Sequence, residues 1–379
     1  MSEYDDLDEG AVDDGEEMAR PSRRRKKKAR PWDKTNAGES SDSDFFWDDL
    51  KQNIQDGVIT PFISGHLCYD YLFQGHFRSK IEDWAEDMEY PWTARSNVTQ
   101  VAQYCRIRRG ERATRNYYLK FLKEELLEDA YEKPEMSRRA LEKVANKLEN
   151  ASFTEVAADL GYLDFANLPE HPLRVLAELP LPIYVTTCYH QLLESALEQM
   201  DKKPVSETYW WADRNTGRMG ESIFTSEPGY EPSEERPLVF HLFGRDDNPQ
   251  SLVITENDFL DFLINLSRDL YDTTVGGKPE TQSLPTVVTN TLGESSPFLL
   301  GYDMTKWDFR ILFRGLLSAE HITRREEGMF IQVEQDNVQM EEEVQRDLEK
   351  YLLQTSKLRI YSGTPNDCLE EIHRLWQRG

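Results

Sequence analysis

Histidine and cysteine stand two residues apart at two places in the sequence. His66 and Cys68 form one pair, and Cys188 and His190 form the other. Two imidazoles and two thiolates make a good tetrahedral ligand set for zinc, provided that folding brings the pairs together. In the alternative interpretation these side chains are buried packing residues. The second interpretation is favoured, because a spacing of two residues is tight for two ligands of one metal.

Composition excludes several classes of function. The 379-residue chain has a formal net charge of −25, of which residues 1–44 contribute −4 and residues 45–379 contribute −21. We therefore expect no general nucleic-acid binding by the body, since phosphate backbones need a cationic face. No apolar run is long enough to span a membrane, no signal pattern opens the chain, and the four cysteines are scattered. These features predict a reduced cytoplasmic protein without membrane attachment.

The first 44 residues read as a disordered tail, in which an acidic block precedes the basic run 20–30. Such a tail buries too little apolar surface to offset its ordering entropy. The basic run could bind nucleic acid or an acidic partner, or serve in localisation, and the alternative is a solvated tail. Residues 45–379 are predicted to form one domain.

Strands and helices alternate along this domain. Apolar, β-rich runs predict strands at 58–63, 181–187, 238–243, 298–301, 329–333 and 358–361. Helical patterns occupy 49–56, 69–90, 190–200, 256–271, 305–317, 338–353 and 366–377, with Thr255 and Asp258 as an N-terminal cap. A mostly helical insertion covers about 90–180, and 203–236 and 275–296 read as loops. The pattern predicts an α/β, Rossmann-like fold with a doubly wound, largely parallel sheet.

Ligands of such sheets bind at the carboxyl ends of the strands, so the turns there are the candidate site. We expect a pocket between the turns at 64–68, 186–190, 243–245 and 301–303, with 361–364 as a further strand-end turn. Outside these turns, Trp210 and Trp211 could anchor a partner protein. The favoured interpretation is that they form a cluster packed on the body of the domain. His171, His321 and His373 read as surface or helix-end residues.

Several stretches resemble one known family when they are taken together and in order. They are TPFI at 60–63, VAQY at 101–104, LPIYVTT at 181–187, PLVFHL at 237–242, SLVITE at 251–256, LLGY at 299–302, WDFR at 307–310 and RIYSG at 359–363. Over about 49–379 the chain is similar to the SIR2-like domain of prokaryotic immunity and conflict proteins, distant relatives of sirtuins. The resemblance implies NAD as the cofactor and, for many members, NAD hydrolysis to ADP-ribose and nicotinamide in antiviral defence. It also implies protein partners and a homo-oligomer.

The first two motifs of this family are altered here. The family's first turn is Gly-Ala-Gly, and this chain has Ser64, Gly65 and His66, so Ser64 and His66 replace glycines that let the backbone approach a pyrophosphate. The second motif is Thr-Thr-Asn-Tyr-Asp. Thr187 is kept, whereas Cys188 replaces the Asn and His190 replaces the Asp.

The later motifs are also changed. The third is His-Leu-His-Gly, whose second His is the family's general base; Phe243 takes its place before Gly244, and His241 remains two residues upstream. In the fourth motif Gly301 is kept and Asp303 replaces a Ser. The last turn, Gly363-Thr364, keeps the residue types of the family. The resemblance thus implies cofactor contacts at Ser64, Gly65, His66, Thr187, Gly244, Gly301, Asp303, Gly363 and Thr364.

Three hypotheses follow. In the first, the chain is a pseudoenzyme that scaffolds or regulates a defence or signalling assembly, because the departures concentrate on the site while the strands survive. In the second, it is an active NAD+ hydrolase with His241 as base and Asp303 or Glu256 orienting water, which requires several compensating changes within about 1 Å. In the third, His66, Cys68, Cys188 and His190 bind zinc in the former NAD pocket. NAD itself remains a doubtful ligand under the first and third hypotheses.

Overall fold

A computed structural model describes residues 40–133, 136–211, 222–271, 284–304, 306–317, 328–332, 342–361 and 364–377. The basic run 20–30, His321 and Gly363 lie outside these ranges.

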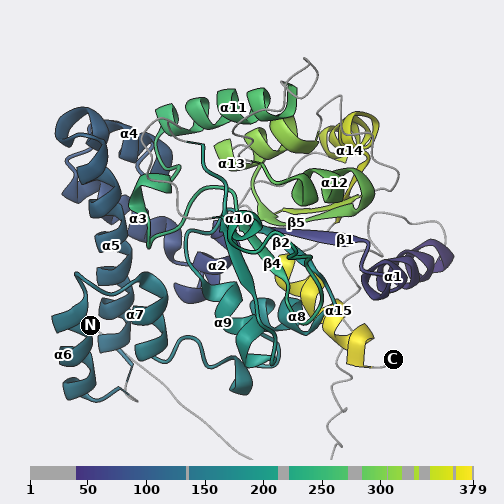
Figure 1. Cartoon of the computed structure of the whole chain (residues 1–379). Helices are drawn as coiled ribbons and strands as arrows, with labels where there is room; N and C mark the ends of the chain where they lie inside the picture. The colour runs from purple at the N-terminus through teal and green to yellow at the C-terminus, as the bar shows by residue number, and fades with distance from the viewer. Residues whose placement is uncertain are drawn as a thin grey trace, which may run out of the picture.

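In the described ranges, seven parallel strands form one sheet in the order β3-β4-β2-β1-β5-β6-β7 (Figure 1). The strands are β1 Ile59–Ile63, β2 Ile183–Thr186, β3 Val205–Thr208, β4 Leu238–His241, β5 Ser296–Tyr302, β6 Gly328–Gln332 and β7 Leu358–Tyr361. Every residue of β1, β2, β4 and β5 is buried, as expected for a parallel sheet covered on both faces. The predicted doubly wound α/β fold is therefore confirmed. The prediction missed β3, which lies inside the supposed loop 203–236.

Most of the helices between β1 and β2 form a separate lobe beside the sheet, seen at the left of Figure 1. The helices of this connection are α2 Gly65–Leu72, α3 Phe77–Asp87, α4 Val98–Arg109, α5 Glu111–Tyr131, α6 Arg138–Lys147, α7 Phe153–Asp159 and α8 Pro172–Glu178. A single helix over 69–90 was predicted. It is divided instead, because Gln74 and Gly75 adopt φ values of 51° and 81° that no α-helix can contain.

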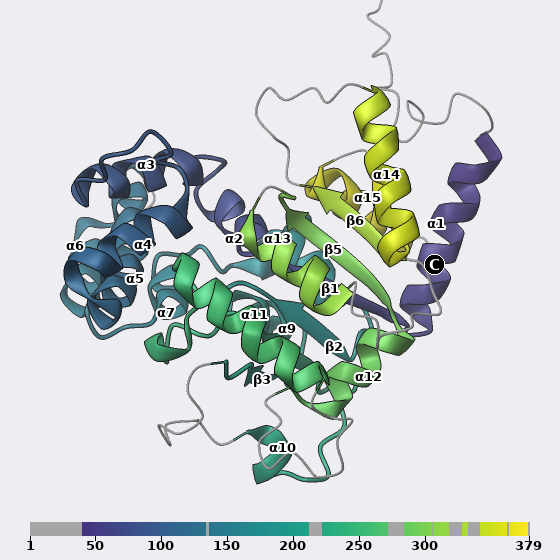
Figure 2. The ribbon, with the colours of Figure 1, turned by 90° about the horizontal axis from the view of Figure 1, so that it is seen from above.

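Most of the remaining helices cover the two faces of the sheet (Figure 1), whereas α10 lies apart from it (Figure 2). The remaining helices are α1 Ser40–Gln55, α9 Leu192–Gln199, α10 Ile223–Ser226, α11 Glu256–Tyr271, α12 Thr286–Glu294, α13 Trp307–Ile311, α14 Glu342–Ser356 and α15 Pro365–Gln377, and α13 continues as a π-helix over Leu312–Leu317. Helix α12 falls in the supposed loop 275–296. The predicted cap of α11 is confirmed, because the Thr255 amide donates to Asp258 Oδ2 (3.0 Å) and the Asp258 amide donates to Thr255 Oγ1 (3.2 Å).

The burial of the tryptophan pair and of His171 tests two further predictions. Trp210 and Trp211 are only 7% and 5% exposed, and the Trp211 indole donates to the Ser251 carbonyl, so the packing interpretation is confirmed. His171 is the N-cap of α8, a helix end as predicted, although it is buried. Among the described residues, no helix is both long and apolar enough to cross a membrane.

Candidate functional site

The turns after β1 and β5 are joined at the centre of the sheet. Ser64 begins α2, and its Oγ accepts a hydrogen bond from the Leu67 amide (3.2 Å) and donates one to the Gly301 carbonyl (2.5 Å). Gly301 has φ +74°, and a Cβ there would lie 2.8 Å from Ser64 Oγ and 2.9 Å from Leu67 Cβ. Glycine is therefore required, because the turn needs both the left-handed conformation and the missing side chain. Strand order reverses between β1 and β5, which is where open α/β sheets place ligands.

The turn after β2 adjoins the same region. The Gly65 amide donates to Thr187 Oγ1 (3.3 Å), and the Thr187 amide donates to the Ile63 carbonyl (3.0 Å). The Cys188 amide is bound by Thr186 Oγ1 (3.0 Å). Three predicted turns thus meet through their backbones and small hydroxyl side chains.

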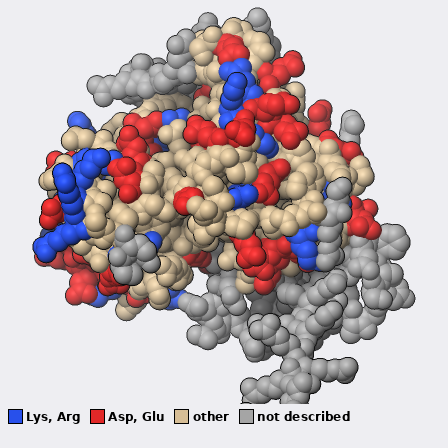
Figure 3. Space-filling view, turned by 90° about the horizontal axis from the view of Figure 1, so that it is seen from below, with Lys and Arg blue, Asp and Glu red and all other residues tan. Residues whose placement is uncertain are grey.

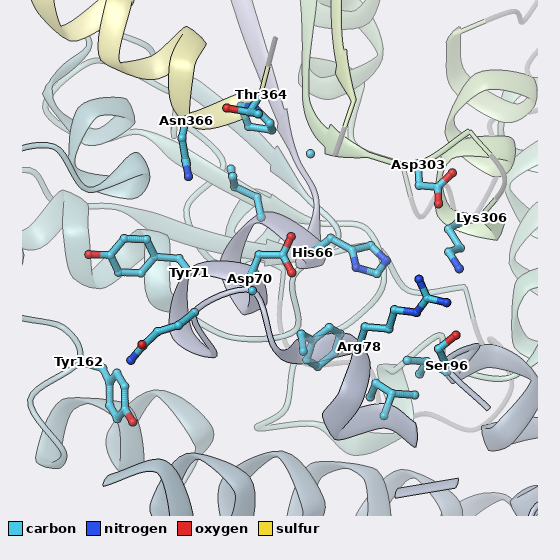
Figure 4. Close-up of a pocket in the computed structure, with 18 of the residues that line it drawn as sticks. His66, Asp70, Tyr71, Arg78, Ser96, Tyr162, Asp303, Lys306, Thr364 and Asn366 are labelled. Atoms are coloured by element: carbon cyan, nitrogen blue, oxygen red, sulfur yellow. The ribbon is translucent and has the colours of Figure 1, made fainter. Parts of the chain in front are cut away.

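A cavity of about 1000 Å³ opens beside these turns (Figure 4). His66, Gly301, Asp303 and Thr364 line it, so four of the predicted cofactor-contact residues share one pocket. At the end that holds Asp303, Figure 4 shows His66, Arg78 and Lys306 close by. Burial raises the pKa of the neighbouring Asp308 carboxyl, and His66 opposes this shift. This end therefore combines cations and acids, and its net charge is small.

The other end of the cavity is formed by the helical lobe and was missed by sequence reasoning. Tyr71, Tyr162, Lys133 and Leu168 line it together with Asn366 from α15. The Lys133 ammonium lies 3.4 Å from the centre of the Tyr162 ring, which is a cation–π contact. Apart from Asn366, which follows the turn after β7, these residues lie far from a strand end in the sequence, so no turn signal could have indicated them.

His190 lies outside the lining of this cavity and is 1% exposed. Its Nε2 is 2.9 Å from the Tyr69 hydroxyl and its Nδ1 is 3.1 Å from Asp246 Oδ2. Phe153 stacks on the imidazole with ring centres 3.9 Å apart. Burial would raise the pKa of Asp246, but the bond from His190 and its charge lower it below the ordinary value. The His190 side chain therefore forms a buried contact between α2, α7 and the turn after β4.

His241 is fully buried and is also absent from the cavity lining. Its Nε2 lies 2.7 Å from Glu194 Oε1 on α9, and its Nδ1 lies 3.0 Å from the Cys188 carbonyl oxygen. Burial acts to raise the pKa of Glu194, yet the His241 charge and the hydrogen bonds from His241 and Ser206 lower it. Both ring nitrogens of His241 are thus held by protein groups.

Phe243, at the position where the resemblance implies a general base, is 2% exposed. Its ring packs edge-on against Phe259 and Phe262 of α11, with centres 5.2 and 5.1 Å apart. Gly244 has φ +88°, and a Cβ there would collide with the Ser251 carbonyl. The predicted pocket is therefore corrected: the cavity lies at the turns 64–68 and 301–303, whereas packed side chains occupy the turns 186–190 and 243–245.

The four candidate zinc ligands do not form a coordination site. In the described parts of the chain, no group of three or more His, Cys, Asp and Glu residues is placed to hold a metal. His66 borders the cavity, whereas His190 is engaged by Tyr69 and Asp246. The thiols of Cys68 and Cys188 do approach each other, and their hydrogen bond together with burial holds the pKa of Cys188 well above its ordinary value. A protonated thiol is a poor metal ligand.

Comparison with known protein families relates part of this chain to one of them. The model of the SIR2-like domain matches residues 182–360, which run from the start of β2 to β7 and include the turns after β2, β4 and β5. No curated protein matches the chain. The sheet order and the joined turns at its centre agree with this match, so residues 182–360 are similar to the SIR2-like domain.

Proposed function

We propose that the protein is a non-catalytic SIR2-like component that scaffolds or regulates a prokaryotic defence or signalling assembly. The observation that carries the proposal is the packing of Phe243. A phenyl ring cannot accept a proton, and this one is enclosed by Phe259 and Phe262. At the position where the family has its general base, this chain has a phenylalanine that packs in the hydrophobic core.

The surroundings of the two remaining imidazoles support the same proposal. A base must reach within hydrogen-bond distance of the proton that it removes. His241 is held by Glu194 and the Cys188 carbonyl, and His190 is held by Tyr69 and Asp246. An NAD+ hydrolase that used His241 would have to break its buried hydrogen bond to Glu194 and turn the ring toward the cavity.

The cavity suggests what such a component could still do. Its lining includes His66, Gly301, Asp303 and Thr364 from the strand-end turns, and the connection between β1 and β2 adds Tyr71 and Tyr162. A pocket of this volume with a few convergent polar groups has the form of a small-molecule site. Ligand binding without turnover would suit a regulatory role.

The direct test is an NAD-consumption assay on the purified full chain, with nicotinamide and ADP-ribose measured by mass spectrometry. We expect NAD loss no faster than in buffer alone. Loss that rises in proportion to protein concentration and falls in His241→Gln would refute the proposal in favour of the displaced-base hydrolase. Equal loss in wild type and His241→Gln would exclude His241 as the base.

A binding measurement separates ligand retention from catalysis. Calorimetry with ADP-ribose and with NAD on the wild type would be compared with Lys306→Ala, at the cavity, and Arg138→Ala, an exposed cation on α6. If the cavity takes such ligands, Lys306→Ala weakens binding and Arg138→Ala leaves it unchanged. Equal effects of the two substitutions would place the ligand elsewhere.

A further inference from the structure

Helix α11 exposes aliphatic side chains on its outer face. Leu260 and Ile264, one turn apart, are 46% and 50% exposed. The inner face of the same helix packs on the body through the buried side chains of Phe259, Phe262 and Leu266. Figure 1 shows α11 along the upper edge of the molecule, and Figure 2 shows it from above with no labelled element covering it. Exposed aliphatic residues at a spacing of four on a helix form a stripe that a partner could cover.

Charged residues of opposite sign flank this stripe. Asp261 and Arg268 are both exposed and lie seven residues apart, so they share one side of the helix with Ile264. Within the described part of the chain neither side chain forms an ion pair. Their midpoint falls next to Ile264. An antiparallel copy of the same helix would therefore set Asp261 against Arg268 of the partner subunit on both sides of a central Ile264 contact.

We propose that the outer face of α11 is a homodimer interface, in which two copies of this chain pack antiparallel about a two-fold axis beside Ile264. A two-fold interface brings one patch against itself, so the patch must be complementary to itself. The face of α11 meets this requirement with one apolar centre and one charge of each sign. A different partner would need its own matching acid and base, whereas a second copy supplies both.

The neighbouring helix α4 also carries an exposed aliphatic residue. Ile107, at the end of α4, is 74% exposed. Helix α4 is fixed beside α11, because Arg106 binds Asp258 at 2.8 Å and Gln103 accepts a hydrogen bond from the Asn257 amide. Ile107 therefore belongs to a helix that lies beside the first turn of α11.

Sedimentation equilibrium on the full chain tests the interface. We expect the wild type to dimerise and Ile264→Asp to raise the dissociation constant by at least about tenfold, because the variant buries like charges at the axis. The matched control is Leu353→Asp, which makes the same kind of change at an aliphatic residue on α14 that is 39% exposed. A wild type that stays monomeric up to about 100 µM would overturn the proposal. So would equal effects of the two substitutions.

Charge exchange gives a sharper test of the antiparallel arrangement. Asp261→Arg alone and Arg268→Asp alone would each oppose like charges and weaken the dimer. An equimolar mixture of the two single variants would recover it, because every pair across the axis is then of opposite sign. The double variant, with both changes in one chain, would recover it as well. A mixture no stronger than the single variants would exclude this pairing.

Crosslinking reports the position of the axis. Ile264→Cys would form a disulfide between copies under mild oxidation, since both thiols lie beside the two-fold axis. The four native cysteines are buried, so they would compete little. Leu353→Cys would stay uncrosslinked at the same protein concentration. Crosslinking at 353 but not at 264 would overturn the proposal.

Discussion

His190 and His241 are two imidazoles near strand ends that serve the structure. Each imidazole lies between a carboxylate and a second polar group, and each is buried. A buried polar group with both partners in place rigidifies its surroundings, and removing one partner costs the full desolvation penalty of the other. At these positions we therefore expect substitutions to affect folding first.

His171 makes the pH dependence of stability testable at one residue. Its Nδ1 accepts the Leu173 amide at 3.0 Å, and burial lowers its pKa to about 3. The folded pKa lies below the unfolded value, so stability is complete above about pH 6.5 and is lost as the pH falls toward 3. The loss amounts to about 2 kcal/mol between pH 7 and pH 5.

The matching variant is His171→Asn, which can still cap α8 but cannot titrate. Urea unfolding at pH 7 and at pH 5 would show a smaller pH effect in His171→Asn than in the wild type. An identical pH effect in both proteins would contradict the assignment.

Gly301 provides a second prediction at the residue scale. We expect Gly301→Ala to lower the free energy of unfolding by about 2–4 kcal/mol, because the strain of a positive φ adds to overpacking against Ser64 and Leu67. Gly161→Ala is the matched control, since Gly161 has φ +75° and open space around it. The control should cost about 1 kcal/mol. Equal losses in chemical denaturation would show that the contact with α2 is unimportant.

At the scale of elements, Asp258 fastens the helical lobe to the body. Its Oδ1 binds Arg106 at 2.8 Å and Arg115 at 3.0 Å, while its Oδ2 caps α11. We expect Asp258→Asn to cost about 3–5 kcal/mol, because it removes the charge opposite the buried Arg115. Hydrogen exchange should accelerate in α4 and α5. Glu89→Gln, at an exposed pair with Arg108, should leave exchange unchanged.

The accuracy of prediction also differs by element. Six strands were predictable because buried parallel strands are short, continuous apolar runs. Strand β3 was missed because its four residues are only half-buried and include Ser206 and Glu207, and its strand conformation comes from pairing with β4. Helix α12 was missed because Thr286–Glu294 has three threonines and two valines, which are poor helix formers.

At the scale of the molecule, the sequence located the strand-end turns but could not tell which of them remain open. His66 and His190 follow neighbouring strands, yet one borders the cavity and the other is enclosed by Tyr69 and Phe153. The difference depends on side chains from α2 and α7, which are distant in sequence. Packing of this kind cannot be derived from motif spacing alone.

Net charge leads to a prediction for the whole molecule. Figure 3 shows several patches of Asp and Glu side chains among uncharged residues, with fewer groups of Lys and Arg. At a net charge of −25, self-repulsion destabilises the compact state. Raising NaCl from about 10 to 150 mM shortens the Debye length from about 30 to 8 Å and should raise Tm. Sucrose at equal osmolarity controls for solute effects, and a Tm that falls with salt alone would contradict the prediction.

The central position of β1 has a consequence for synthesis on the ribosome. β1 pairs with β2 and with β5, so Phe62 lies opposite Val185 on one side and Leu299 on the other. The second partner is made more than 230 residues later. Until then, the growing chain must carry an apolar strand with an open edge, a condition that favours slow folding and contact with chaperones.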